Sequence, residues 1–205
     1  MLKTISFIVI SIVLLKLIVP SCSIKISINV AKCLSDLATQ ELTGSYNYLQ
    51  LSSKLGTNNA YPGFASLFTK LSDDDSSKAH DLVKFLALRK AKLDRLINVN
   101  GVSIRAGIKN TMDVVNALSA ARNQNKEAWN IAVRCHQEAD NAKDANVQDY
   151  LESHVLDHHI EVERLLEDFD NRFNEAQEFE LKLVIFMLDE ELLNTYGDRR
   201  KDIFS

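Results

Sequence analysis

Four stretches of the chain place polar side chains where a helical pattern calls for apolar ones. Between residues 149 and 169 the apolar residues recur every three or four positions, yet a histidine fills one of the inward places. Similar interruptions occur in three other apolar stretches. The interrupting residues are Glu41, Asp75, Lys78, Asn125 and either His158 or His159. Interruptions in four stretches indicate a buried polar site between four helices, and carboxylates and imidazoles are ligands of transition metals.

As a metal centre this set of residues is incomplete. Bundle sites for two metal ions use inward glutamates and Glu-x-x-His pairs. Here Lys78, whose ammonium group has no lone pair, stands three residues after Asp75 in place of a histidine, and Asn125 offers a neutral oxygen in place of a bridging carboxylate. The residues therefore favour a buried ion pair of Glu41 and Asp75 with Lys78. One weakly held metal on Glu41, Asp75 and His159 stays open as an alternative.

Four long helices must position these residues. Apolar spacing predicts helices from about 31 to 55, from Pro62 to Leu93, from about 112 to 142 and from about 147 to 170, with Leu49 and Trp129 on inward stripes. Residues 98–109 show no helical period and form a connection longer than a hairpin needs, so the third helix is expected to run parallel to the second.

A fifth helix is expected after residue 174. It is apolar on most of its circumference, which predicts burial against partner subunits. The expected fold class is therefore all-α: an antiparallel four-helix bundle with a long crossover between helices two and three and a short fifth C-terminal helix.

The start of the chain has the features of a secretory leader. A charged beginning and an apolar run from residue 5 to 15 predict a signal peptide over residues 1–23, followed by one domain over residues 24–205. Cleavage removes Lys3 and Lys16 and no acidic residue, which leaves 22 basic and 28 acidic side chains and a net charge of −6. This acidic balance argues against nucleic acid as a partner.

Two cysteines remain after cleavage, Cys33 and Cys135. In an oxidising compartment an even pair indicates one disulfide, and two separate buried thiols are the alternative. The spacing does not decide whether such a bond lies within one chain or joins two subunits.

Three segments of the chain have distinctive residue patterns. They are Glu41-Leu42-x-x-Ser45-Tyr46-x-Tyr48-Leu49, then Asn116-Ala117-Leu118, and Asp149-Tyr150-Leu151-Glu152-Ser153-His154 with Leu156. These segments resemble animal ferritins. The resemblance runs from about residue 30 to the end, and the leader and the cysteine pair extend it to the secreted ferritin subunits of insects. It implies a hollow shell of 24 subunits that stores iron as a ferric mineral.

The resemblance carries over unevenly to the ferroxidase site. Glu41 and Tyr48 match that site, and Asp75 is a shortened glutamate. The family's histidine, glutamate and glutamine are replaced by Lys78, Asn125 and His159. A shift of one residue in the second helix would bring Ser76 and Ala79 to the site, which are no better as ligands. The resemblance thus implies a light-chain-like subunit without efficient ferroxidase activity, working with a heavy-type partner.

Three further sets of residues match other ferritin features. Asp149, Glu152 and His136 match residues of the three-fold channels, where rings of carboxylates concentrate cations. Two acids and a histidine on the second helix fall near positions that start the mineral; these are Asp73, Asp74 and His80. Apolar residues of the fifth helix resemble the four-fold contacts, among them Phe186, Met187, Leu188, Leu192 and Leu193.

Without the family, the acidic residues have simpler interpretations. Asp149 and Glu152 would be the acidic first turn of a helix, and residues 73–75 a solvated face. The leading hypothesis is an iron-storage subunit of a secreted shell. The alternatives are a ferroxidase with an unusual ligand set around Glu41, Tyr48, Asp75 and His159, and a secreted ferritin-fold protein with no role in iron.

Overall fold

The computed structural model describes residues 25–57, 61–105, 108, 113–177 and 179–198. Its regular elements within these ranges are helices, without a strand. They are α2 (Ile28–Thr57), α3 (Pro62–Leu88), the 3-10 turn η1 (Val99–Gly101), α5 (Val114–Asn141), α6 (Ala145–Leu151), the π-helical segment η2 (Glu152–Leu156), α7 (Asp157–Glu175) and α8 (Leu181–Tyr196). The expected signal peptide, residues 1–23, lies outside the described residues.

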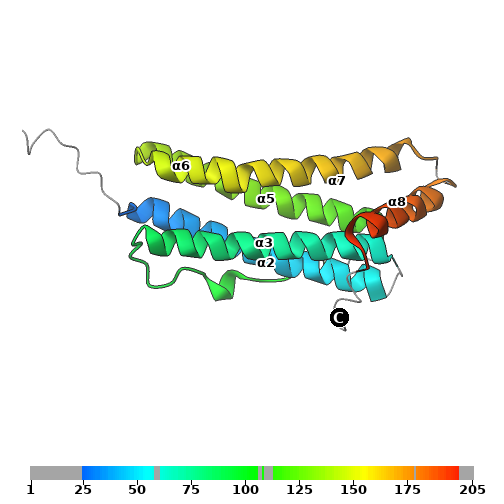
Figure 1. Ribbon diagram of the computed structural model, residues 1–205, viewed down its shortest axis with the longest axis horizontal. Helices are drawn as coiled ribbons and strands as arrows, with labels where there is room; N and C mark the ends of the chain where they lie inside the picture. Colours follow the sequence, from blue (N-terminus) through cyan, green and yellow to red (C-terminus); the bar gives the residue numbers. More distant parts are fainter. Residues whose placement is uncertain (1–24, 58–60, 106–107, 109–112, 178, 199–205) are drawn as a thin grey trace, which may run out of the picture.

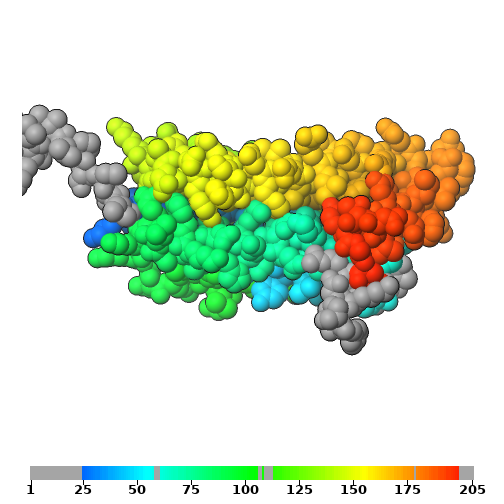
Figure 2. Space-filling model, in the orientation of Figure 1, coloured from blue at the N-terminus to red at the C-terminus, as the bar shows by residue number. Residues whose placement is uncertain are grey.

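The long helices lie side by side along the long axis of the molecule (Figure 1). Helices α2 and α3 run antiparallel, as do α5 and the continuous α6–η2–α7 segment, and the connection after α3 returns along the bundle so that α5 runs parallel to α3. Helix α8 lies across one end of the bundle, on the outside (Figure 2), where it packs mainly on α3. The expected all-α bundle with a long crossover and a short fifth helix is confirmed.

Local sequence explains where the helices begin and end. Pro62 occupies the first turn of α3, and Asp113 caps α5 by accepting a hydrogen bond from the backbone N–H of Asn116 at 2.8 Å. The prediction that the second helix continues to Leu93 is wrong. Helix α3 ends at Leu88 because Lys90 adopts φ 52°, a left-handed conformation that the helix cannot continue through.

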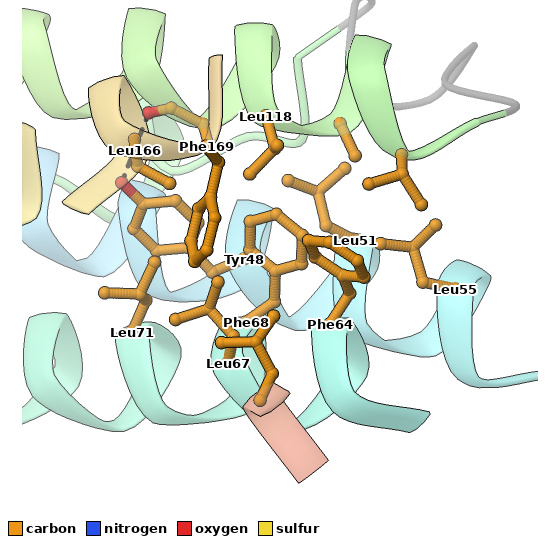
Figure 3. Close-up of a cluster of buried hydrophobic side chains, with 14 of the residues drawn as sticks. Tyr48, Leu51, Leu55, Phe64, Leu67, Phe68, Leu71, Leu118, Leu166 and Phe169 are labelled. Carbon is orange, nitrogen blue, oxygen red and sulfur yellow. Dashed lines mark hydrogen bonds between the residues drawn. The ribbon is translucent and has the colours of Figure 1, made fainter. Parts of the chain in front are cut away.

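Two apolar clusters fill the bundle. One surrounds Tyr48 and Phe68 near the α8 end (Figure 3), and the other surrounds Leu34 and Leu86 at the opposite end. On each long helix the two clusters are separated by a gap in sequence, which runs from 38 to 48 on α2, 71 to 82 on α3, 121 to 132 on α5 and 155 to 162 on α6–η2–α7. A polar layer therefore crosses the bundle between two apolar halves.

Two residues expected in the core lie outside it. Leu49 is 49% exposed and Trp129 is 38% exposed. Neighbouring residues take the inward positions, Tyr48 on α2 and the small residues Ala128 and Ala132 on α5. Since Ala128 and Ala132 occupy the inward face of α5, Trp129 stands on an adjoining, partly exposed face.

Cys33 and Cys135 meet inside the second cluster. Their Cα atoms are 5.4 Å apart, a separation that a disulfide within one chain spans. In the part of the chain that the structure describes, no helix is both long and apolar enough to cross a membrane.

Candidate metal centre

The polar layer brings together one residue from each long helix. Glu41 of α2, Asp75 of α3, Asn125 of α5 and His159 of α7 all lie in the gaps between the apolar clusters, and each is at most 3% exposed. The sequence could predict this level of the bundle because each residue interrupts an apolar stripe. It could not predict which side chains bond to each other.

His159 is held on both sides of its ring. Its Nδ1 lies 2.9 Å from Asn125 Oδ1, and its Nε2 lies 3.0 Å from Glu41 Oε1. The amide nitrogen of Asn125 donates to the backbone carbonyl of His159 at 2.9 Å, which fixes Oδ1 as the acceptor toward the ring. Nδ1 must therefore carry a proton, and Nε2 shares a proton with Glu41. Neither ring nitrogen has a lone pair free for a metal while these bonds hold.

Lys78 does not take the place expected of it. It is half-buried, and the described residues contain no ion pair within 4.0 Å between Lys78 and either Glu41 or Asp75. The predicted buried ion pair is therefore wrong, and His159 is the partner of Glu41 instead. The physical reason is that His159 is 2% exposed and its imidazole reaches Glu41 directly, whereas Lys78 is only half-buried.

Asp75 and His158 form the second half of the centre. His158 Nε2 lies 4.0 Å from Asp75 Oδ1. Burial and then the charge of Glu41 raise the pKa of Asp75 well above its ordinary value. Burial and then the charge of Lys78 lower the pKa of His158 to about 3, so this imidazole is neutral at physiological pH.

Several buried polar atoms around Asp75 have no hydrogen-bond partner in the described part of the chain. They are Glu41 Oε2, His158 Nε2 and Gln124 Nε2. Gly44 makes room for Asp75, because a Cβ at that position would lie 2.1 Å from Asp75 Oδ2. All three atoms can bond to water, and Glu41 Oε2 and His158 Nε2 could also contact a cation, whereas Gln124 Nε2 is a donor and could not. Even so, among the residues described, no three His, Cys, Asp or Glu side chains converge as ligands of one metal ion.

Tyr48 lies at the edge of the polar layer. Its hydroxyl donates to the backbone carbonyl of Ala121 at 3.3 Å, and its ring stacks on Phe68 (Figure 3). Burial, and then the charges of Asp75 and Glu41, raise the pKa of the Tyr48 hydroxyl. This side chain therefore stays neutral and bonds to α5 rather than to the carboxylates.

Sequence reasoning missed three members of the polar layer. Glu163 Oε2 lies 3.4 Å from Asn125 Nδ2, and Asn47 Nδ2 donates to Gln124 Oε1 at 2.9 Å. Glu163 follows His159 by one helical turn, a spacing that could have predicted its presence. Asn47 and Gln124 adjoin residues of the apolar stripes, and no periodic signal separates them from solvent-facing polar residues.

Two of the three residues of the expected channel are in contact near the C-terminal end of α5. His136 Nε2 lies 2.6 Å from Glu152 Oε1, and Asp149 is exposed on α6 nearby in sequence. The simpler interpretation of these acids as the first turn of a helix is wrong. Helix α6 begins at Ala145 with Asp144 as its N-cap, so Asp149 stands in its second turn and Glu152 begins the π-helical segment.

The residues expected to start the mineral do not form one cluster. Asp73 and His80 are exposed and lie two turns apart on α3. Asp74 pairs with Lys70, and His80 Nδ1 lies 2.7 Å from the backbone carbonyl of Ser76. Part of the negative charge of this face is thus offset by Lys70.

Comparisons with known proteins agree with this geometry. A protein-family model described as a ferritin-like domain matches residues 31–176. A relative from Trichoplusia ni, a ferritin light chain, is 29% identical over 178 residues, which cover 82% of this chain and 76% of the relative. The family match runs from residue 31, within α2, to just past the end of α7, and so includes every residue of the polar layer.

Proposed function

Because the chain belongs to the ferritin family, we propose that it is the iron-storage subunit of a secreted ferritin shell and has no efficient ferroxidase activity of its own. Family membership and the likeness to a light chain support an iron-storage subunit. The observation that carries the finer proposal is the arrangement at His159, whose two ring nitrogens are taken up by Asn125 and Glu41.

Rapid oxidation of ferrous iron needs two metal ions held close together by carboxylates and imidazoles. In this chain one oxygen of Glu41 is hydrogen-bonded to His159. Burial and the charge of Glu41 raise the pKa of Asp75 and so favour its protonated form. Lys78 adds a positive charge beside Asp75. These three features oppose the binding of cations at the centre.

The proposed route of iron begins at the pair of His136 and Glu152 with Asp149. In a shell of 24 subunits, copies of these residues would meet around three-fold channels and concentrate ferrous ions there. Asp73, Asp74 and His80 on α3 would then bind iron at the inner surface as the mineral starts. A heavy-type subunit would supply oxidation.

The proposed location is the secretory pathway or the extracellular fluid. The leader expected over residues 1–23 supports it, and so does the close approach of Cys33 and Cys135, which would form a disulfide in an oxidising compartment. The acidic balance supports a protein without nucleic-acid partners. The exposed apolar face of α8 supports contacts with other subunits.

A second candidate is a ferroxidase with an atypical ligand set. The unpartnered atoms Glu41 Oε2 and His158 Nε2 favour it, because both are buried and could accept a cation. Under this alternative, iron would have to draw Glu41, Asp75 and His158 together as ligands in place of His159, because these side chains do not converge in the described structure.

Adding ferrous iron to the purified homopolymer in air tests the proposal. We expect slow oxidation, whereas mixed shells with a heavy-type subunit should oxidise iron quickly and retain it. Oxidation by the homopolymer as fast as by a heavy-type homopolymer would overturn the proposal in favour of the ferroxidase. Isolation from the source as a monomer or dimer without iron would instead support a ferritin fold with no role in iron.

A further inference from the structure

The apolar pattern of helix α8 does not by itself determine which face is buried. It is apolar on most of its circumference, with Ile185, Leu188 and Leu192 buried and Leu183, Phe186 and Met187 between 58% and 61% exposed. Burial of apolar area alone does not distinguish these two faces, because both would gain by leaving water. A directional contact is needed to select one rotation of the helix.

Asp189 provides this contact. It lies on the inner face of α8, is 4% exposed, and its Oδ1 accepts a hydrogen bond from the backbone N–H of Phe64 at 2.9 Å. Phe64 stands in the first turn of α3, where backbone N–H groups have no partner within the helix and the helix dipole favours a negative charge. A carboxylate 125 residues further along the chain thus serves as a cap of α3.

Gly63 makes the close contact possible. A Cβ at this position would lie 1.9 Å from the backbone carbonyl oxygen of Asp189 and 2.9 Å from the backbone nitrogen of Leu193. These are backbone atoms of α8, so they cannot yield without moving the helix. Only glycine allows α8 to approach α3 closely enough for the bond between Asp189 and Phe64.

We propose that Gly63 and Asp189 together fix the rotation of α8 on each subunit and direct the face formed by Leu183, Phe186 and Met187 outward before subunits assemble. A buried polar group can form its hydrogen bond in only one packing arrangement, so it selects that arrangement among several that bury similar apolar area. The consequence for assembly rests on the proposed shell; the orientation of α8 within the subunit does not.

Hydrogen–deuterium exchange, followed by mass spectrometry on the full chain, tests the proposal through the peptides of α8. Asp189→Ala removes the acceptor, and we expect about fivefold or faster exchange in α8 with α2, α5 and α7 unchanged. Asp189→Asn keeps an oxygen at the same place and should retain most of the protection. Glu190→Ala removes the same charge from the adjacent exposed position and serves as the matched control.

Gly63→Ala gives a second test, because the two possible outcomes differ in direction. Alanine is the better helix former, so without a contact against α8 this substitution should slow hydrogen–deuterium exchange in α3 and leave α8 unchanged. We expect instead faster exchange in α8 and a smaller fraction of complete shells by native mass spectrometry. Unchanged α8 exchange in both Asp189→Ala and Gly63→Ala, or an equal effect of Glu190→Ala, would overturn the proposal. A wild-type protein that forms no shell would contradict the proposed function while leaving the exchange comparison valid.

Discussion

Replacing His159 with leucine is expected to destabilise the subunit strongly, and adding Glu41→Leu to the same chain is expected to restore most of the loss. Both side chains are at most 2% exposed, and Nε2 and Oε1 lie 3.0 Å apart. The hydrogen bond therefore belongs to a buried pair in which each group satisfies the other.

The structure predicts that the two single variants lose different amounts of the free energy of unfolding. His159→Leu leaves Glu41 buried without this bond, and its Oε2 already lacks a partner, so the expected loss is about 3–5 kcal/mol in the free energy of unfolding. Glu41→Leu leaves the imidazole bonded to Asn125, and the expected loss is about 1–3 kcal/mol. In the double variant only Asn125 Oδ1 loses a partner, so the loss should fall to about 1–2 kcal/mol.

Guanidinium unfolding followed by circular dichroism measures these differences. Glu161→Leu, at an exposed position of α7, is the control and should stay within about 0.5 kcal/mol of the wild type. If the losses of the two single variants simply add in the double variant, the buried pair does not exist as described. The same variants should leave the slow iron oxidation of the homopolymer unchanged, and a large fall would assign the pair to catalysis.

Three other perturbations have expected outcomes. The variant Cys33→Ser/Cys135→Ser opens a cross-link that spans 102 residues and should lower the free energy of unfolding by about 4–5 kcal/mol in guanidinium titrations, and an unchanged midpoint would show that no bond forms. Because the folded-state pKa of Asp75 is raised, its contribution to stability is complete below its unfolded pKa and is lost as pH rises through the folded pKa. Asp75→Asn should therefore stabilise the protein near neutral pH and have little effect near pH 4, as thermal unfolding at the two pH values would reveal; equal effects would refute this. The variant Asp149→Asn/Glu152→Gln should slow iron uptake by mixed shells while leaving their mass unchanged, and uptake at the wild-type rate would remove these residues from the channel.

The sequence by itself determined the helices and the level of the polar layer. Helical periodicity is a local property, so apolar stripes interrupted at Glu41, Asp75, Lys78, Asn125 and either His158 or His159 already predict an inward polar layer. The crossover and the fifth helix follow from loop length and from the apolar circumference of α8. These features depend on residues close together in the sequence, so they can be inferred without the tertiary structure.

Only the tertiary structure decided which groups bond. One residue of helix turns a side chain by about 100°, so periodicity that fixes a face leaves neighbouring positions unresolved, as Leu49 and Trp129 demonstrate. Hydrogen bonds need partners placed within tenths of an ångström, which is why His159 rather than Lys78 meets Glu41. The contact of Asp189 with the start of α3 joins residues 125 positions apart, and no local pattern in the sequence encodes it.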